Sequence, residues 1–292
     1  MSQPRFKVLT SGDTPADLMT MMVIERATGR CLGAVGASFF RPWVFPLYTP
    51  SGLTVLQEFP YEHPWHNGIF VAQHPVNIGE RSANFWAVPL MRDFNDHLMT
   101  RIGRQNVQGE PDIEVEDERV TFTFRSIWRD EHEEPVLDEV RTVRFRALPD
   151  ATVVDVTSRK LAAYGALEFP QTKFGSVGVR AEPRLLPPLG GAILADGGRR
   201  GEETLVDAQP ESDFLAYEGQ WPGQGTFGVC MVLPNPELRG PWFACDWGMA
   251  VYNPTYFAGL QVPKDAEWTV FLRVIAYDGP LTPTRAAEWQ GM

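Results

Sequence analysis

The feature that most constrains the fold of this chain is an alternation of apolar and polar residues with a period of two. It is clearest in residues 120–125 (VTFTFR), 143–147 (VRFRA) and 268–274 (WTVFLRV). Successive side chains of a strand point to opposite faces, so the pattern predicts strands with one face on a core. Further strands are predicted at residues 152–157, 176–180 and 227–233, with turn signals at 148–150 (LPD) and 233–236 (LPNP). We therefore expect an all-β fold, a large antiparallel β-sandwich with few short helices.

Helical signals are sparse. A short helix is predicted at residues 282–288, with Thr282 as its N-cap and Pro283 at its first position. Residues 182–213, which contain several prolines and two Gly-Gly pairs, are predicted to form a long loop at the rim. No linker separates two regions of different composition, so we expect a single domain over residues 1–292.

Charge narrows the range of partners. The formal net charge of −11 and the pI near 5.0 disfavour binding to nucleic acid or to an anionic membrane surface. Residues 1–10 lack the basic start and apolar stretch of a signal peptide, and no run of about 18 apolar residues occurs. We expect a cytoplasmic protein whose partner is a small molecule, and the sequence leaves a homodimer open.

Cysteine usage excludes two classes of site. Cys31, Cys230 and Cys245 are odd in number, far apart and in no CxxC arrangement. Neither a disulfide framework nor a thiolate zinc site is indicated, and we expect all three thiols to be buried as small apolar groups.

The candidate catalytic and binding residues are concentrated in segments rich in aromatic, His and Pro residues. They are residues 41–52 (RPWVFPLYTPSG), 62–68 (EHPWHNG) and 83–86 (ANFW). His63 and His66 lie three residues apart between helix-disfavouring Pro and Gly residues, so we expect both on a loop or a strand end. Such a pair suits a proton donor and acceptor, or two ligands of a divalent metal with a third from His74 or Glu62. The alternative is that the imidazoles only hydrogen-bond backbone carbonyls in a tight loop.

Residues near the histidines have the composition of a sugar site. Trp65 and Trp86 could stack on the apolar face of a sugar ring, and Arg41 and Asn67 could hold its hydroxyls. Tryptophan is also a common core residue, and this alternative stays open for both side chains.

Two further residues are candidates for catalysis. Lys173, in residues 169–175 (FPQTKFG), follows a predicted strand among apolar and small residues, where a lysine can have a lowered pKa and stabilise an oxyanion. Asp246, among the aromatic residues of 242–254, is a candidate carboxylate partner for a histidine. The alternatives are a lysine that extends to solvent and an aspartate that caps a turn.

These segments resemble a bacterial family labelled PmoA-like, otherwise a domain of unknown function. The matching elements are residues 46–52, His63-Pro64-x-His66, Asn84-Phe85-Trp86, Thr172-Lys173-x-Gly175, Val179-Arg180, Trp247-Gly248 and Asn253-Pro254. The chain departs from the family at Trp65, Asn67 and Phe174, where the family has histidine, arginine and glutamate.

The resemblance implies a fold similar to the galactose-mutarotase-like supersandwich, whose members act on or bind carbohydrates, often with histidines and a carboxylate on the concave face. Relatives tend to be encoded near sugar oxidoreductases and isomerases, which favours a role in sugar processing. The family label suggests a methane oxygenase. The membrane subunit of that enzyme needs several transmembrane helices, and this sequence has no apolar run long enough for one, so methane oxidation is not expected.

The leading hypothesis is an enzyme that acts on a sugar or an oxidised sugar by proton transfer, as an epimerase, a lyase or a glycoside-cleaving enzyme. His63 and His66 are its general acid and base, Lys173 stabilises negative charge, and no cofactor is expected. One alternative is a non-catalytic carbohydrate-binding or regulatory domain. Another is a lyase or hydrolase assisted by a divalent metal at the two histidines.

Overall fold

The computed structural model of the chain describes residues 3–11, 19–38, 40–88, 100–198, 206–209, 212–235, 238 and 240–292. Among these residues, nine strands form a first antiparallel sheet. Their order is β1 (Phe6–Thr10), β2 (Met19–Glu25), β3 (Cys31–Ala37), β4 (Pro42–Leu47), β5 (Ile69–Gln73), β14 (Gly175–Arg180), β20 (Met249–Tyr252), β19 (Trp242–Ala244) and β16 (Val206–Gln209).

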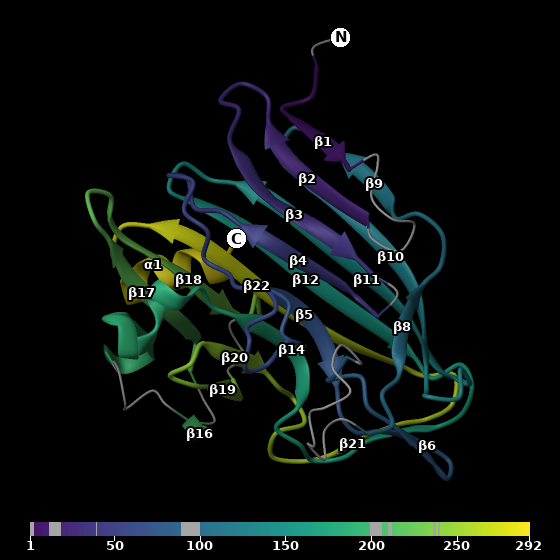
Figure 1. Cartoon of the computed structure of the whole chain (residues 1–292). Coiled ribbons are helices and arrows are strands. Elements are labelled where there is room, and N and C mark those ends of the chain that lie inside the picture. Colours follow the sequence, from purple (N-terminus) through teal and green to yellow (C-terminus); the bar gives the residue numbers. More distant parts are fainter. Residues whose placement is uncertain are drawn as a thin grey trace.

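A second antiparallel sheet lies behind the first, so that β1 to β4 cross in front of β10 to β12 (Figure 1). Its order is β15 (Ala192–Ala195), β17 (Phe214–Trp221), β18 (Gly225–Val232), β22 (Glu267–Asp278), β12 (Ala151–Leu161), β11 (Pro135–Ala147), β10 (Val120–Arg129) and β8 (Arg104–Val107), with β9 (Asp112–Val115) also paired to β10. A small third sheet contains β21 (Leu260–Val262), β13 (Leu167–Phe169), β6 (Val76–Ile78) and β7 (Arg81–Ala83). The predicted antiparallel sandwich is confirmed, and every strand predicted from alternation lies in β10, β11, β12, β14, β18 or β22.

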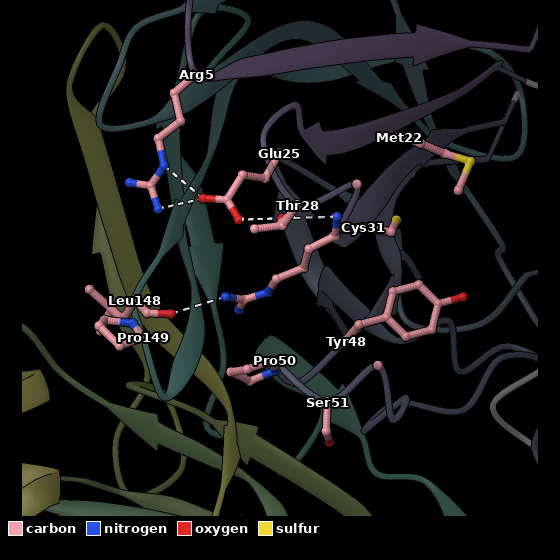
Figure 2. Close-up of a pocket in the computed structure, with 13 residues that line it drawn as sticks. Arg5, Met22, Glu25, Thr28, Cys31, Tyr48, Pro50, Ser51, Leu148 and Pro149 are labelled. Atoms are coloured by element: carbon pink, nitrogen blue, oxygen red, sulfur yellow. Dashed lines mark hydrogen bonds and ion pairs between the residues drawn. The ribbon is translucent and has the colours of Figure 1, made fainter.

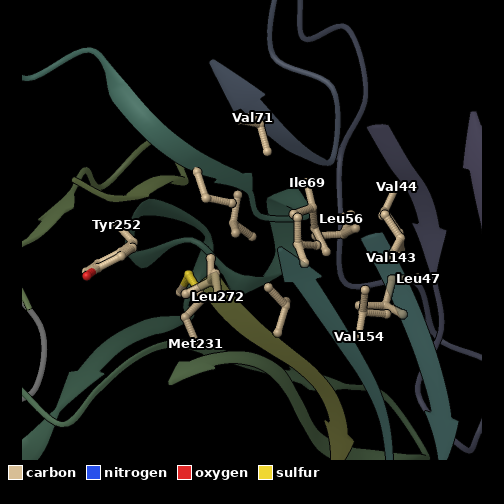
Figure 3. Close-up of a cluster of buried hydrophobic side chains, with 14 of the residues drawn as sticks. Val44, Leu47, Leu56, Ile69, Val71, Val143, Val154, Met231, Tyr252 and Leu272 are labelled. Carbon is tan, nitrogen blue, oxygen red and sulfur yellow. The ribbon is translucent and has the colours of Figure 1, made fainter. Parts of the chain in front are cut away.

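The main core lies between the two large sheets. Val44 and Val71 of the first sheet and Val154 and Leu272 of the second belong to this core (Figure 3). Each is at most 1% exposed. Burial of such side chains stabilises the fold by about 1.5–3 kcal/mol each relative to exposure. The division of the chain into one domain stays a prediction.

The first sheet also buries apolar side chains on its other face. In β5, Ile69 and Val71 join the main core, whereas Phe70 and Ala72 point to the opposite side. We call the group on that side the outer cluster. It comprises Phe40, Trp65, Phe70, Ala72, Trp86, Val88, Met249 and Val251, with Trp43, Phe174, Phe243, Cys245 and Trp247 packed against it. Both faces of β5 are therefore buried, which explains why its sequence does not alternate.

The helical segments are short. The α-helix α1 (Pro283–Gln290) begins after Thr282, whose side chain accepts a hydrogen bond from the backbone N–H of Arg285 at 3.2 Å, as predicted for an N-cap. The 3₁₀ turns of the described residues are η2 (Pro183–Leu185), η3 (Pro187–Leu189) and η4 (Asp196–Gly198). Within the described residues, no helix is long and apolar enough to cross a bilayer.

Two expectations need correction. Residues 182–213 are not one long loop, because β15 and β16 within them pair with β17 and β19; residues 199–205 and 210–211 lie outside the described part. All three cysteines are free, but only Cys230 is buried, whereas Cys31 and Cys245 are half-buried.

Candidate active site

The two histidines lie on a loop between β4 and β5, on the side of the outer cluster. The loop is closed at its base by an isolated bridge between Glu58 and Asn67 and by a hydrogen bond from the Gly68 N–H to the Gln57 carbonyl at 3.0 Å. Two successive turns shape its tip, and in the second the His66 N–H donates to the carbonyl of His63 at 3.0 Å.

This turn explains the spacing of the histidine motif. Pro64 stands at the second position of the turn, where its fixed φ is favoured. Because the turn brings its first and fourth residues together, the rings of His63 and His66 lie parallel, with centroids 5.1 Å apart and planes 7° apart. The expectation of two imidazoles in one small region is met.

A third ring lies parallel to both imidazoles. Trp247, in the turn between β19 and β20, has its ring centroid 4.5 Å from that of His63 and 5.8 Å from that of His66, with planes within 5°. On the sheet side, the rings of Phe70 and Trp86 each lie 5.7 Å from that of His66. His66 is thus enclosed by aromatic rings from three separate segments of the chain.

His66 is buried, and its ring nitrogens form no hydrogen bonds with the described residues. It is 1% exposed, and neither Nδ1 nor Nε2 has a hydrogen-bond partner in the described part of the chain. Burial, and then the charges of His63, Arg180 and Arg41, lower the pKa of His66 well below its usual range. The ring is therefore neutral at pH 7. An unsatisfied buried polar group costs about 1–3 kcal/mol, and such groups are frequent at functional sites.

His63 is the more accessible member of the pair, with 33% of its side chain exposed. Its Nδ1 lies 4.0 Å from a carboxylate oxygen of Glu62. Partial burial raises the pKa of Glu62, but the hydrogen bond from its own backbone and the charges of Arg180 and His63 outweigh this effect and lower it. An ionised carboxylate beside one ring nitrogen suits a histidine that gains and loses a proton.

Arg180, at the end of β14, connects the carboxylate to the tryptophan. Its guanidinium forms an ion pair with Glu62, donates to Gln57 Oε1 at 3.3 Å, and lies 4.8 Å from the centroid of Trp247. Its Nη1 is buried and has no acceptor among the described residues. The site therefore holds a fixed cationic donor with a free N–H group. The sequence signalled this residue only through the Val179-Arg180 motif, which gave no role.

Arg41 and Asn67 stabilise the loop through buried hydrogen bonds. Arg41 is 1% exposed and donates to Asn67 Oδ1 at 2.8 and 3.2 Å, to the carbonyl of Trp65, and to the carbonyl of Trp86 at 3.2 Å. Burial, reinforced by the charge of Arg141, lowers the pKa of Arg41 to about 9, so it stays protonated at pH 7. These contacts fix the loop, whereas the role expected for both side chains was to hold sugar hydroxyls.

The predicted stacking residues lie inside the outer cluster. Trp65 and Trp86 are 2% and 3% exposed and meet the ring of His66 edge-on. Their ring faces are covered by protein. Solvent does reach the rings of Trp247, Phe59 and Tyr61, of which the last two lie on the loop itself.

Lys173 and Asp246 both have exposed side chains. Lys173 is not enclosed by apolar residues as expected, because it lies in the loop before β14 with its Nζ 5.5 Å from the ring centroid of Phe174. Asp246 occupies the turn that presents Trp247, where the Cys245 N–H and the Met249 carbonyl bond at 2.9 Å. A turn position was the alternative considered for this aspartate.

The metal alternative needs a third ligand. In the described ranges, no three His, Cys, Asp or Glu side chains form a group that could hold a metal ion. His74 lies beside Phe174, and Glu62 is paired with Arg180.

Comparison with solved structures gives distant similarities. The chain is similar to a galactose mutarotase-like protein from Lactobacillus casei, with 8% identity, coverage of 93% of this chain and 100% of that one, and a TM-score of 0.42. It is also similar to a putative aldose 1-epimerase from Escherichia coli K12, with 11% identity, coverage of 94% and 100%, and a TM-score of 0.39. Similarities this low carry no argument about activity.

Family comparison is more informative. No curated protein matches the sequence significantly. A family model described as a family of unknown function, DUF6807, matches residues 33–290, and it gives no support to the PmoA-like label. The match includes the histidine loop, Arg180 and Trp247. Because it covers most of the 292 residues, the chain belongs to DUF6807.

Proposed function

We propose that the chain is a carbohydrate-active enzyme that transfers a proton at a sugar or an oxidised sugar. The observation that carries the proposal is the parallel pair of histidines, in which His63 is partly exposed and His66 is buried, with ring nitrogens that have no partner among the described residues. A solvent-reached imidazole beside an ionised carboxylate suits general acid–base catalysis.

Each residue of the site has a distinct role in this proposal. His63 takes a proton from a carbon next to the sugar carbonyl and returns it, oriented by Glu62. Negative charge develops on the carbonyl oxygen, and the nearby positive charge of Arg180 stabilises it. This assigns to Arg180 the role first considered for Lys173. His66 keeps a neutral ring beside His63, and the partly exposed Trp247 and the exposed Tyr61 support the apolar face of the sugar.

Epimerisation follows when water, and not His63, delivers a proton to the opposite face of the carbon. Loss of a leaving group from the neighbouring carbon gives elimination, the route by which a glycoside could be cleaved. Both reactions begin with the same proton removal, so one assay serves for both.

The test is incorporation of solvent deuterium into the substrate. Aldoses, uronic acids and 3-keto sugars are incubated with the protein in D₂O, and loss of C–H signal is followed by NMR. We expect exchange with at least one class, and a loss of at least 100-fold in the exchange rate for His63→Gln, within the usual range for removal of a general base, about 10²–10⁴. His132→Gln, at the exposed tip of the hairpin between β10 and β11, is the matched control and keeps the parent rate.

Other outcomes separate the rivals. Exchange that persists in His63→Gln contradicts the proposed role. A sugar that binds, by calorimetry, but never exchanges supports the non-catalytic carbohydrate-binding domain. Exchange that stops with a chelator and returns with a divalent cation supports the metal-assisted lyase or hydrolase.

A further inference from the structure

A large cavity lies at another place in the fold and shares no lining residue with the histidine site. It has a volume of about 840 Å³, within the range of about 300–1,000 Å³ for small-molecule sites. Its walls come from the end of β2, the start of β3, residues 48–52 and the turn between β11 and β12 (Figure 2). No part of the proposed function uses it.

The central polar group of this cavity is the guanidinium of Arg30. It donates to the carbonyls of Leu148 at 3.0 Å and Ala151 at 2.9 Å and to Thr152 Oγ1 at 2.5 Å; the first of these bonds is the dashed line at Leu148 in Figure 2. All three acceptors are neutral, and among the described residues no ion pair involves Arg30. In the part of the chain that the structure describes, two of its five N–H groups remain without an acceptor, the buried Nε–H among them. The cation is held firmly, and its charge is not neutralised by direct contact.

The nearby carboxylates have other partners. Glu25 accepts from Arg5 at 2.6 Å and from Thr28 Oγ1 at 2.6 Å. Asp278 accepts from the N–H and hydroxyl of Ser51 at 2.8 and 2.7 Å. The charged side chains that line the cavity are therefore two arginines and one carboxylate, an excess of one positive charge in a chain of net charge −11.

The rest of the lining is largely apolar. Met22, Pro50, Leu148 and Pro149 contribute aliphatic surface, and the ring of Tyr48 forms one side (Figure 2). We propose that this cavity is a second binding site, for a small organic acid whose carboxylate pairs with Arg30 and whose apolar body lies against these side chains. A carboxylate gives the guanidinium a charge-assisted partner, and the aliphatic side chains of the lining contact the apolar body of the acid.

Cys31 offers a direct readout, because its half-buried side chain lines the same cavity. Alkylation by iodoacetamide is followed by peptide mass spectrometry at pH 8.5, since burial raises the pKa of this thiol. Phenylacetate is the probe, and phenylacetamide is its neutral isostere. We expect phenylacetate to slow alkylation of Cys31 at least fivefold and phenylacetamide to have no effect. Cys245, half-buried in the outer cluster, is the internal control and reacts at an unchanged rate.

Three results would overturn the proposal. Equal protection by the acid and the amide means that charge is not recognised. No protection by either means that the cavity does not bind this class. Equal protection by inorganic phosphate means that the site takes a bare oxyanion and not an organic acid.

Arg30→Gln tests the assigned cation. We expect protection by phenylacetate to require at least tenfold more ligand in this variant and to stay unchanged in Arg26→Gln, which alters an exposed neighbouring arginine outside the lining. Because Arg30 also braces the turn at residues 148–151, Arg30→Lys is made in parallel. It keeps the charge and is expected to keep the preference for the acid over the amide. Unchanged protection in Arg30→Gln contradicts the proposal.

Discussion

At the residue scale, the clearest sign of function is a buried polar side chain whose polar atoms do not contribute to stability. His66 occupies a place among Phe70, Trp86 and Trp247 that an apolar ring could fill, yet its two ring nitrogens have no partner in the described ranges. Arg180 similarly has a buried Nη1 for which the same ranges offer no acceptor. Stability alone does not explain such choices, whereas a bound ligand that completes the hydrogen bonds does.

His66→Phe tests this reading through the pH dependence of stability. The folded parent keeps His66 neutral, whereas the unfolded chain protonates it below pH 6.5, its ordinary pKa. Acid therefore favours unfolding of the parent through this group, and the variant lacks the effect. We expect the variant to be at least as stable as the parent at pH 7.5, with an advantage that grows below pH 6.5 by up to about 1.4 kcal/mol per pH unit.

Urea unfolding at pH 7.5 and pH 5.0 measures both free energies. An advantage of His66→Phe that is the same at the two pH values contradicts the lowered pKa. A variant several kcal/mol less stable than the parent contradicts the absence of hydrogen bonds to the ring.

At the element scale, the site depends on two tight turns that lie in different connections between strands. One is the turn from His63 to His66, and the other is the hairpin between β19 and β20 that presents Trp247. Gly248 has φ of 91° in this hairpin, and a Cβ there would lie 2.6 Å from Leu186 Cδ2. Glycine is favoured over any other residue at this position for two reasons, the positive φ and the close approach of Leu186.

Gly248→Ala is therefore expected to destabilise the protein and to disturb the tryptophan. The matched control is Gly223→Ala in the hairpin between β17 and β18, where φ is 79° but no atom lies within 4 Å of the added Cβ. Backbone strain costs both variants about 1 kcal/mol, and the clash adds to it only at Gly248. Denaturant midpoints and the rate of deuterium exchange measure the difference. Equal effects of the two substitutions on both readouts contradict the account.

Sequence reasoning found the elements better than the site. Strands with one buried face, such as β10 and β11, alternate visibly, and Thr282 with Pro283 identified α1. The histidine turn was predictable because its residues are local. Trp247 and Arg180 were not assigned to it, because the turn that holds Trp247 and the strand end that holds Arg180 lie more than 100 residues away in the sequence, and only strand pairing brings them near. Burial of Arg41 and exposure of Lys173 depend on the tertiary packing and leave no local pattern.

At the scale of the whole molecule, a buried charged network joins the sheets beneath the site. Glu139 accepts from Arg141 at 2.7 and 2.9 Å, from Trp128 Nε1 at 2.8 Å and from Ser158 Oγ at 2.5 Å. Arg141 also donates to the carbonyl of Pro42 in the other sheet at 2.8 Å. The network thus connects the second sheet to the residue that follows Arg41.

Glu139→Gln removes the carboxylate of this network and leaves the buried cations Arg141 and Lys160 without its counter-charge. We expect a loss of about 3–5 kcal/mol in the free energy of unfolding. Glu267→Gln, which breaks an exposed ion pair with Arg159 at 2.9 Å, is the control and costs about 0–1 kcal/mol. Chemical denaturation measures both variants, and similar losses in the two contradict the assigned role of the network.

The central claim is that His63 and His66 form one site in which His66 stays neutral. The most direct measurement is the ¹⁵N spectrum of the protein labelled at its five histidines, recorded from pH 7.5 to 5.5 and then with the sugar that exchanges deuterium. We predict that the ring of His66 stays neutral over this range, and that the sugar shifts the signals of His63 and His66 but not that of the exposed His132. Protonation of His66 near pH 6.5, or sugar binding that leaves both signals unchanged, contradicts the account.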